Sequence, residues 1–241
     1  MIQQEHQPPI MPTYLKVILA VAIILFAASA AALVVLSGMR GAATVTMPPG
    51  SAGAPLNAQT AALPDPQVED LRILPFTLTT QDGATITDAD LKGNVTIIDF
   101  MFTHCPLVCP MMTGTLADLA DRLKGTDVRF LSISVDPDHD TPERLREFAG
   151  RYNADFSRWT FARGDRDATW RMVREGLMFA IGDDTDLTIT LPDGSTMLNI
   201  RHPSHFVLVG RDGRVLGLYS STDEDAVNRL EQRARLLANP R

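Results

Sequence analysis

The sequence contains very few cysteines, and the two that it has lie close together. Cys105 and Cys109 are the only cysteines among 241 residues. A pair this close in the chain cannot close a long loop, which excludes a framework of structural disulfides. We therefore interpret Cys105 and Cys109 as a chemically active pair.

Positive charge is also scarce. The chain has 22 Lys and Arg residues against 29 Asp and Glu residues, which gives a formal net charge of −7. A broad nucleic-acid surface needs clustered Lys and Arg side chains, so we expect no nucleic-acid partner. What is present is a hydrophobic fraction of 45% with 21% charged residues, a balance that is typical of a packed globular core.

One uncharged run dominates the N-terminal part of the chain. Residues Val17–Leu36 form a run of 20 positions without a charged side chain, and a helix of that length spans about 30 Å, one hydrocarbon core. A cleaved signal peptide is the alternative, because the small residues 30–32 lie near the end of the run. Signal-peptide cores are usually shorter, roughly 7–15 residues, so we expect an uncleaved transmembrane helix.

Both interpretations export the rest of the chain. In a bacterium this predicts a single-pass protein of the inner membrane with its globular part in the periplasm. The composition divides the chain into four segments: a polar tail at 1–13, the anchor at 14–38, a flexible linker at 39–67 and a folded domain at 68–241. The linker is assigned because it is rich in Ala, Gly and Pro and lacks apolar periodicity.

Strand and helix patterns alternate within the folded domain. The apolar runs predict strands at 76–80, 94–102, 128–135, 205–209 and 215–219. The amphipathic patterns predict helices at about 111–123, 140–152, 167–175 and 223–237. The helix at 140–152 is expected to begin with a capping box from Asp140 to Glu143, with Pro142 in the first turn.

The order of these segments predicts the fold class. A parallel strand–helix–strand crossover, followed by an antiparallel hairpin and a closing helix, is an α/β arrangement of the thioredoxin-like kind. A generic three-layer α/β domain is the alternative.

Cys105 and Cys109 directly follow the buried strand predicted at 94–102 and precede a helix. The carboxyl end of a strand is where α/β proteins place their sites. A thiol near a helix N-terminus lies close to free N–H groups and the positive end of the helix dipole, which favour its thiolate. Thiolate is the form that binds metals and attacks disulfides, so both chemistries are open here.

The spacing of the pair distinguishes these chemistries. Two cysteines three positions apart form the usual redox motif, whereas Cys105 and Cys109 are four apart. On a regular helix this spacing leaves them about 40° apart on one face, so both sulfurs can converge on one ion. Soft thiolates favour Cu(I), or zinc with further ligands, and a third ligand must come from elsewhere.

Histidine is the natural third ligand, and the chain has five: His6, His104, His139, His202 and His205. The first precedes the anchor, and His104 is expected to project away from an ion held by its neighbour Cys105. His139 follows the strand predicted at 128–135, while His202 and His205 begin the late hairpin, which packs near the cysteine loop in this layout. Taken singly, each is more often a surface or hydrogen-bonded core residue than a ligand.

Three ordered motifs resemble those of the Sco/SenC family. Phe100–Pro110 (FMFTHCPLVCP) is similar to its cysteine signature, Ser134–Pro142 (SVDPDHDTP) to its second motif, and His202–Gly213 (HPSHFVLVGRDG) to its third. The match covers about residues 68–237, and the N-terminal anchor also fits.

The resemblance implies copper delivery to the dinuclear copper site of cytochrome c oxidase. The expected partner is then the copper-receiving subunit of that oxidase, with other copper carriers or thiol reductants as further partners. The resemblance also implies a copper ion held by Cys105, Cys109 and His202. Asp136 and Asp140 match an acidic loop that supports the metal site.

Two features depart from the family pattern or complicate it. Leu107 occupies a position where Asp is common, which lowers the local acidity and could weaken partner recognition without removing a ligand. His205 lies three residues after His202 and is therefore the alternative ligand.

A second functional class uses the same cysteines. A thiol-disulfide oxidoreductase that reduces the cysteines of the oxidase copper site would need Cys105 and Cys109, but it would not need His202. A thiol peroxidase would instead need a single peroxidatic cysteine in an oxyanion-binding turn, and the paired spacing does not fit it. We expect a metallochaperone rather than an enzyme.

Overall fold

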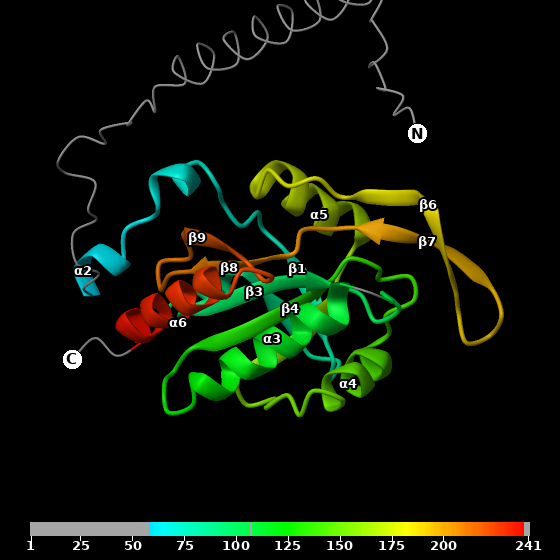
Figure 1. Ribbon diagram of the computed structural model, residues 1–241, viewed down its shortest axis with the longest axis horizontal. Coiled ribbons are helices and arrows are strands. Elements are labelled where there is room, and N and C mark those ends of the chain that lie inside the picture. The colour runs from blue at the N-terminus through cyan, green and yellow to red at the C-terminus, as the bar shows by residue number, and fades with distance from the viewer. Residues whose placement is uncertain (1–57, 107, 239–241) are drawn as a thin grey trace, which may run out of the picture. The chain divides into compact units, whose positions relative to one another are not determined.

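The computed structural model describes residues 58–106 and 108–238, which contain a seven-stranded mixed sheet covered by helices (Figure 1). The predicted anchor at Val17–Leu36 lies outside the described residues. Within the two described stretches, no helix combines the length and the apolar character that a membrane span requires.

The main sheet has the strand order β2-β1-β5-β4-β3-β8-β9. Its three central neighbours β3, β4 and β5 are parallel, whereas β8 runs antiparallel to β3 and forms a hairpin with β9. The strands are β1 (Thr77–Thr80), β2 (Thr85–Thr87), β3 (Thr96–Met101), β4 (Arg129–Ser134), β5 (Trp159–Arg163), β8 (His205–Val209) and β9 (Val215–Ser220).

The helices that pack around this sheet are α2 (Ala58–Ala61), α3 (Val108–Arg122), α4 (Pro142–Gly150), α5 (Arg166–Arg171) and α6 (Glu224–Ala238). Helices α3 and α6 lie side by side (Figure 1), joined by the ion pair between Arg122 and Glu231 at 3.0 Å. The π-helix Met172–Gly176 continues α5. The β3–α3–β4 crossover, the β8–β9 hairpin and the closing α6 have the predicted order.

Strand β3 is buried along its whole length, because it lies between β4 and β8 in the sheet and all six of its side chains face the interior. This explains the almost continuous apolar run predicted as a strand buried on both faces. β3 ends at Met101, so the chain leaves the sheet just before Cys105.

Four strands were not predicted from the sequence, and one of them is β2 (Thr85–Thr87), which pairs antiparallel with β1. β5 adds a third parallel strand beside β4, and β6 (Gly182–Thr190) pairs with β7 (Thr196–Arg201) as a separate two-stranded ribbon. The ribbon has few buried side chains and a register shift between Asp184 and Thr188. It therefore lacks the regular apolar alternation that marks a half-buried strand in the sequence.

Two predicted helix starts also differ. α3 begins at Val108 rather than near residue 111, so Cys109 belongs to its first turn. The predicted capping box at Asp140 is wrong, because Thr141 is the N-cap of α4 and its side chain accepts from the N–H of Arg144. The buried Asp140 carboxylate is instead bonded to Thr103 and Ser134.

Residues assigned to the linker by composition include a segment that contacts the folded body. The N–H of Asp65 donates to the carbonyl of Leu216 at 2.9 Å. The buried guanidinium of Arg233 in α6 donates to the carbonyls of Ala61 and Leu63 and to the Asp65 carboxylate. A buried charge needs such partners, so we propose that the folded body begins near residue 58.

This boundary is testable with two fragments. We expect residues 68–241 to be less stable than residues 58–241 by about 2–3 kcal/mol, because the deletion removes every acceptor of Arg233 described above and leaves it only the Tyr219 hydroxyl. Urea unfolding of both fragments measures the difference. The variant Asp65→Asn in the longer fragment, which keeps the two carbonyls, should lose less. Equal stability of the two fragments would contradict the boundary.

Candidate metal centre

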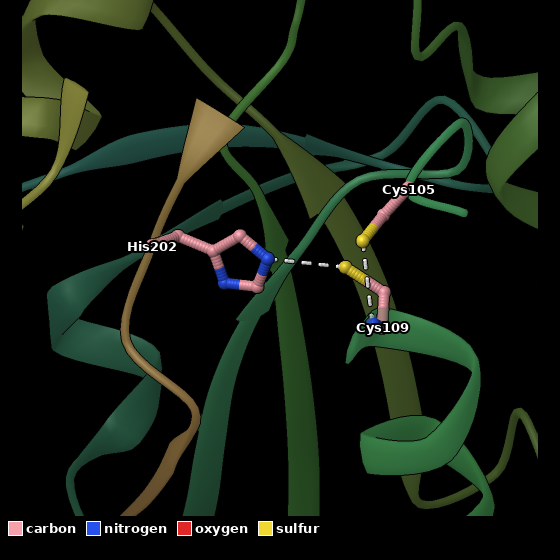
Figure 2. Close-up of side chains that lie close together, drawn as sticks. All are labelled: Cys105, Cys109 and His202. Carbon is pink, nitrogen blue, oxygen red and sulfur yellow. Dashed lines mark hydrogen bonds between the residues drawn. The ribbon is translucent and has the colours of Figure 1, made fainter. Parts of the chain in front are cut away.

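Three segments that are distant in the sequence supply the candidate site. Cys105 lies in the turn after β3, Cys109 is the second residue of α3, and His202 lies between β7 and β8. Their ligand atoms all lie within 4.8 Å of one another. Figure 2 shows both sulfurs and the imidazole directed toward one another. The structure thus brings together the three residues that the resemblance implies.

The site is largely shielded from solvent. Cys105 is 8% exposed and Cys109 is fully buried. The backbone N–H of Cys109 donates to the Cys105 sulfur at 3.4 Å, and the N–H of Phe102 donates to the Cys109 sulfur at 3.5 Å. No disulfide joins Cys105 and Cys109 in this structure, so each sulfur can serve as a ligand.

The histidine is oriented for coordination through its Nε2 atom. His202 Nε2 lies 3.2 Å from the Cys109 sulfur, and Nδ1 lies 3.3 Å from the carbonyl of Pro203. Because a carbonyl can only accept, Nδ1 carries the hydrogen, and Nε2 of the neutral ring has its lone pair toward the sulfurs. The Phe102 ring packs against the imidazole edge-to-face at 5.7 Å between centroids.

The expectation that the helix N-terminus favours the thiolate is wrong for Cys109. Burial raises the pKa of this thiol well above its ordinary value, and the neighbouring Cys105 raises it further. In this environment desolvation outweighs the helix dipole. A bound cation reverses that balance, because a coordinating thiol gives up its proton.

The donor set fits a soft metal ion. Two sulfurs and one imidazole nitrogen are the ligands that favour Cu(I), whereas a structural zinc site needs four protein ligands. Among the described residues, no other group of at least three His, Cys, Asp or Glu residues has its ligand atoms this close together.

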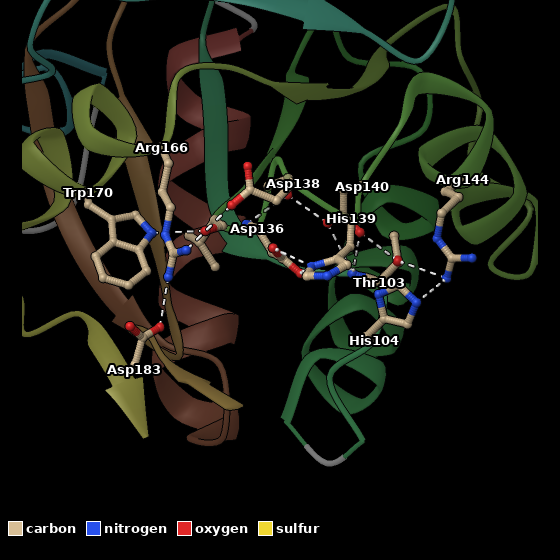
Figure 3. A network of polar contacts seen from close by, with 12 residues as sticks. Thr103, His104, Asp136, Asp138, His139, Asp140, Arg144, Arg166, Trp170 and Asp183 are labelled. Carbon is tan, nitrogen blue, oxygen red and sulfur yellow. Dashed lines mark hydrogen bonds and ion pairs between the residues drawn. The ribbon is translucent and has the colours of Figure 1, made fainter. Parts of the chain in front are cut away.

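Asp140 ties the cysteine loop to the loop after β4. Its buried carboxylate accepts from the Thr103 hydroxyl at 2.6 Å, from the Thr103 N–H at 3.2 Å and from the Ser134 hydroxyl at 2.6 Å (Figure 3). Thr103 precedes Cys105 by two residues, so these bonds hold the backbone that carries the first sulfur. Burial raises the pKa of Asp140 to about 6.

Asp136, the second residue of the acidic loop, contacts a histidine. The Asp136 carboxylate lies 2.9 Å from Nδ1 of His139, whose ring packs edge-to-face on His104. An Arg144 N–H donates to Nε2 of His104 at 2.7 Å, and burial and this cation lower the pKa of His104. Figure 3 shows this network beside the cysteine loop. His104 and His139 therefore bond to neighbouring side chains and lie outside the ligand cluster.

His205 has a different environment from His202. It is the first residue of β8, and its ring packs on Phe179 at 5.0 Å between centroids. Burial lowers its pKa, and its buried Nδ1 has no hydrogen-bond partner. His202 precedes β8 and lies in a loop, so the two histidines do not share a strand.

One residue near the site was missed. Asp99 is fully buried in the middle of β3, where one carboxylate oxygen accepts from the Ser132 hydroxyl at 2.5 Å and the other has no partner. Burial raises its pKa to about 7, and its charge interacts with His202 and Cys109. The signal in the sequence was a single Asp inside an otherwise apolar strand.

Known proteins share this sequence pattern and fold. The family model described as SCO1/SenC matches residues 65–237. The SCO1 protein homolog of Bacillus subtilis (strain 168) is 38% identical over 151 residues, which make up 62% of this chain and 74% of that protein.

Two solved structures add to the comparison. BsSco, described as a member of the Sco family of cytochrome c oxidase assembly proteins with a disulfide switch, is 30% identical with a TM-score of 0.60, over 72% of this chain and 96% of that one. Bradyrhizobium japonicum ScoI, solved with copper bound, is 25% identical with a TM-score of 0.54, over 67% and 99%. These neighbours and the mixed sheet confirm the predicted thioredoxin-like α/β fold. The chain belongs to the SCO1/SenC family.

Proposed function

We propose that this protein binds one copper ion through Cys105, Cys109 and His202 and delivers it to the dinuclear copper site of cytochrome c oxidase. The observation that carries the proposal is the convergence of two sulfurs and an imidazole nitrogen within 4.8 Å. The copper-bound structure of a ScoI relative and the assembly role of BsSco support the choice of metal and of partner.

The residues around the site account for reversible binding of Cu(I). Both cysteines are buried and His202 is half-buried, so water competes poorly for the ion. Three donors leave room for a partner's ligand to join before one of them leaves. Coordination requires the Cys109 proton to leave, and burial raises the pKa of that thiol. Copper binding therefore releases protons, and the affinity should rise with pH.

Delivery to an oxidase requires the domain to lie on the correct side of the membrane. The uncharged run at Val17–Leu36 supports a single-pass anchor in the inner membrane with the metal centre in the periplasm. Such an anchor restricts the carrier to the membrane that holds the oxidase, which raises their effective concentration.

Thiol-disulfide exchange is the second candidate function. The sulfurs of Cys105 and Cys109 lie close together, and a disulfide switch is described for the relative BsSco. In this function the dithiol would reduce the cysteines of the oxidase copper site and become a disulfide itself. It needs both sulfurs and makes no demand on His202.

Anaerobic titration of the reduced full chain with Cu(I) tests the proposed function. We expect one equivalent to bind tightly, with X-ray absorption showing two sulfur ligands and one nitrogen ligand. Failure to bind copper, together with rapid disulfide exchange, would leave the oxidoreductase as the better assignment.

Substitution of the two neighbouring histidines separates the two functions. His202→Ala should lower the Cu(I) affinity by more than the roughly 10-fold that is lost with a residue that only supports a ligand. It should leave the dithiol able to exchange with disulfides. His205→Ala should have little effect, because that ring packs on Phe179.

Chelator competition measures the copper affinity of both variants, and exchange with glutathione measures the reduction potential. If His205→Ala were the damaging change, the ligand assignment would be wrong. If neither variant altered copper binding, the third ligand would lie elsewhere.

A further inference from the structure

A groove of about 820 Å³ lies between α3 and α6, beside the candidate metal centre. On the α3 side it begins at Val108, the residue before Cys109, and continues along Met111 and Thr115. Ser221 and Val227 line the opposite wall. Figure 1 shows the two helices side by side along this face. A body seated in the groove would therefore extend to the edge of the metal centre.

The floor of the groove is apolar and adaptable at the end nearest the metal centre. Met111 is 63% exposed, which is unusual for a large apolar side chain in the first turn of a helix that packs on a sheet. Methionine side chains are unbranched and flexible, and they are common at surfaces that bind partners. Val108, which lies next to it in the groove, is half-buried.

The rim of the groove carries negative charge that is not neutralised within the described residues. Asp118 and Glu224 are exposed on opposite sides, and no ion pair to either is present in that part of the chain. Asp121 pairs with Lys124 at 2.8 Å. Arg122, the one cation among the lining residues, is paired with Glu231 at 3.0 Å.

We propose that this groove is the docking surface for the copper-exchanging protein, and that its occupant is a segment with an apolar side chain flanked by Lys or Arg. The inference rests on the proposed copper function. Copper passes between proteins by ligand exchange, so the partner must bring its own ligands to the buried sulfurs. The groove is apolar at Val108, the chain neighbour of Cys109, and at Met111. Its acidic rim complements a basic segment and steers its approach.

The test compares two double variants of the full chain in detergent. Asp118→Lys with Glu224→Lys reverses the rim charge. Asp167→Lys with Asp186→Lys makes the same change in net charge at exposed positions in α5 and β6. A third variant, Met111→Ser, removes the apolar contact. Each is loaded with Cu(I) and mixed with the separately produced apo copper-receiving domain of a cytochrome c oxidase, and transfer is followed by stopped-flow spectroscopy.

We expect the rim variant to slow second-order transfer at least about 10-fold and to lose most of its salt dependence, since electrostatic steering acts on the association rate. Met111→Ser should slow transfer about 3–10-fold, and the control variant less than about 2-fold. Copper affinity, measured by chelator competition, should stay within about 2-fold for all three.

Other outcomes overturn the inference. Unchanged transfer in the rim and Met111 variants, with normal copper binding, removes the groove from docking and leaves the proposed function intact. If the rim and Met111 variants lose copper affinity as well as transfer rate, these residues belong to the metal centre instead. Ultracentrifugation that shows a dimer dispersed by the rim variant makes a second copy the occupant. A wild-type chain that neither binds nor transfers copper refutes the proposed function, and the docking surface with it.

Discussion

Replacing Cys109 by serine is expected to lower the Cu(I) affinity of this protein at least about 100-fold. Cys109 is fully buried, and its sulfur lies 3.2 Å from Nε2 of His202. Its removal leaves one soft ligand and one imidazole, a pair that serves Cu(I) poorly. The loss should exceed the 10–100-fold range known for residues that only support a ligand. Cys105→Ser should behave alike, because it removes the other sulfur.

The measurement is chelator competition under anaerobic conditions, with circular dichroism to confirm folding. Met112→Leu is the matched control, because Met112 is buried in the same helix and the change removes a sulfur while keeping the volume. The control should keep its copper affinity within about 2-fold. One-to-one tight binding by either serine variant would remove that cysteine from the ligand set.

The sequence predicted the parts of the fold in which burial leaves a regular pattern. Strand β3 and helix α3 were recognised because an apolar run and an amphipathic face follow directly from their positions in the core. The ribbon of β6 and β7 was missed because most of its side chains face solvent. Its strands are held by pairing with each other, and that pairing leaves no mark in a single segment of sequence.

The candidate site was predictable to different degrees for different residues. The two cysteines could be predicted directly, because the chain has no others and both lie at a strand–helix junction. The choice of histidine depended on motif resemblance, since His202 and His205 differ only in how a loop meets β8. Asp140 was expected to cap a helix and Thr141 does so instead. Both roles suit a short polar side chain before a helix, and only the tertiary bonds to Thr103 and Ser134 decide between them.

Asp99 gives the second large expected effect, on stability rather than on binding. The Asp99→Asn variant should be more stable than the wild-type domain at pH 8, by about 4 kcal/mol, and equally stable near pH 4. Burial raises the pKa of Asp99 from 3.8 to about 7, so the folded state binds this proton more tightly than the unfolded state. A rise of about three pKa units corresponds to about 4 kcal/mol.

The sign of the pH dependence follows from that difference in proton affinity. The stability that Asp99 contributes is fully present below about pH 4 and is lost as the pH rises to about 7, because the folded state must then bury a carboxylate with one unpartnered oxygen. Asparagine stays neutral at every pH, and its side-chain oxygen can still accept from the Ser132 hydroxyl.

Urea unfolding of residues 58–241 between pH 4 and pH 8 measures the stability of the wild-type domain and of Asp99→Asn on the same scale. The slope of stability with pH should flatten in Asp99→Asn but stay in Asp186→Asn, a change at an exposed position of β6. Part of the slope should survive in Asp99→Asn, because burial also raises the pKa of Asp140, to about 6. If the slope were the same in wild type and Asp99→Asn, the folded domain would hold Asp99 ionised at neutral pH, and a further hydrogen-bond partner such as a buried water would have to stabilise its second oxygen.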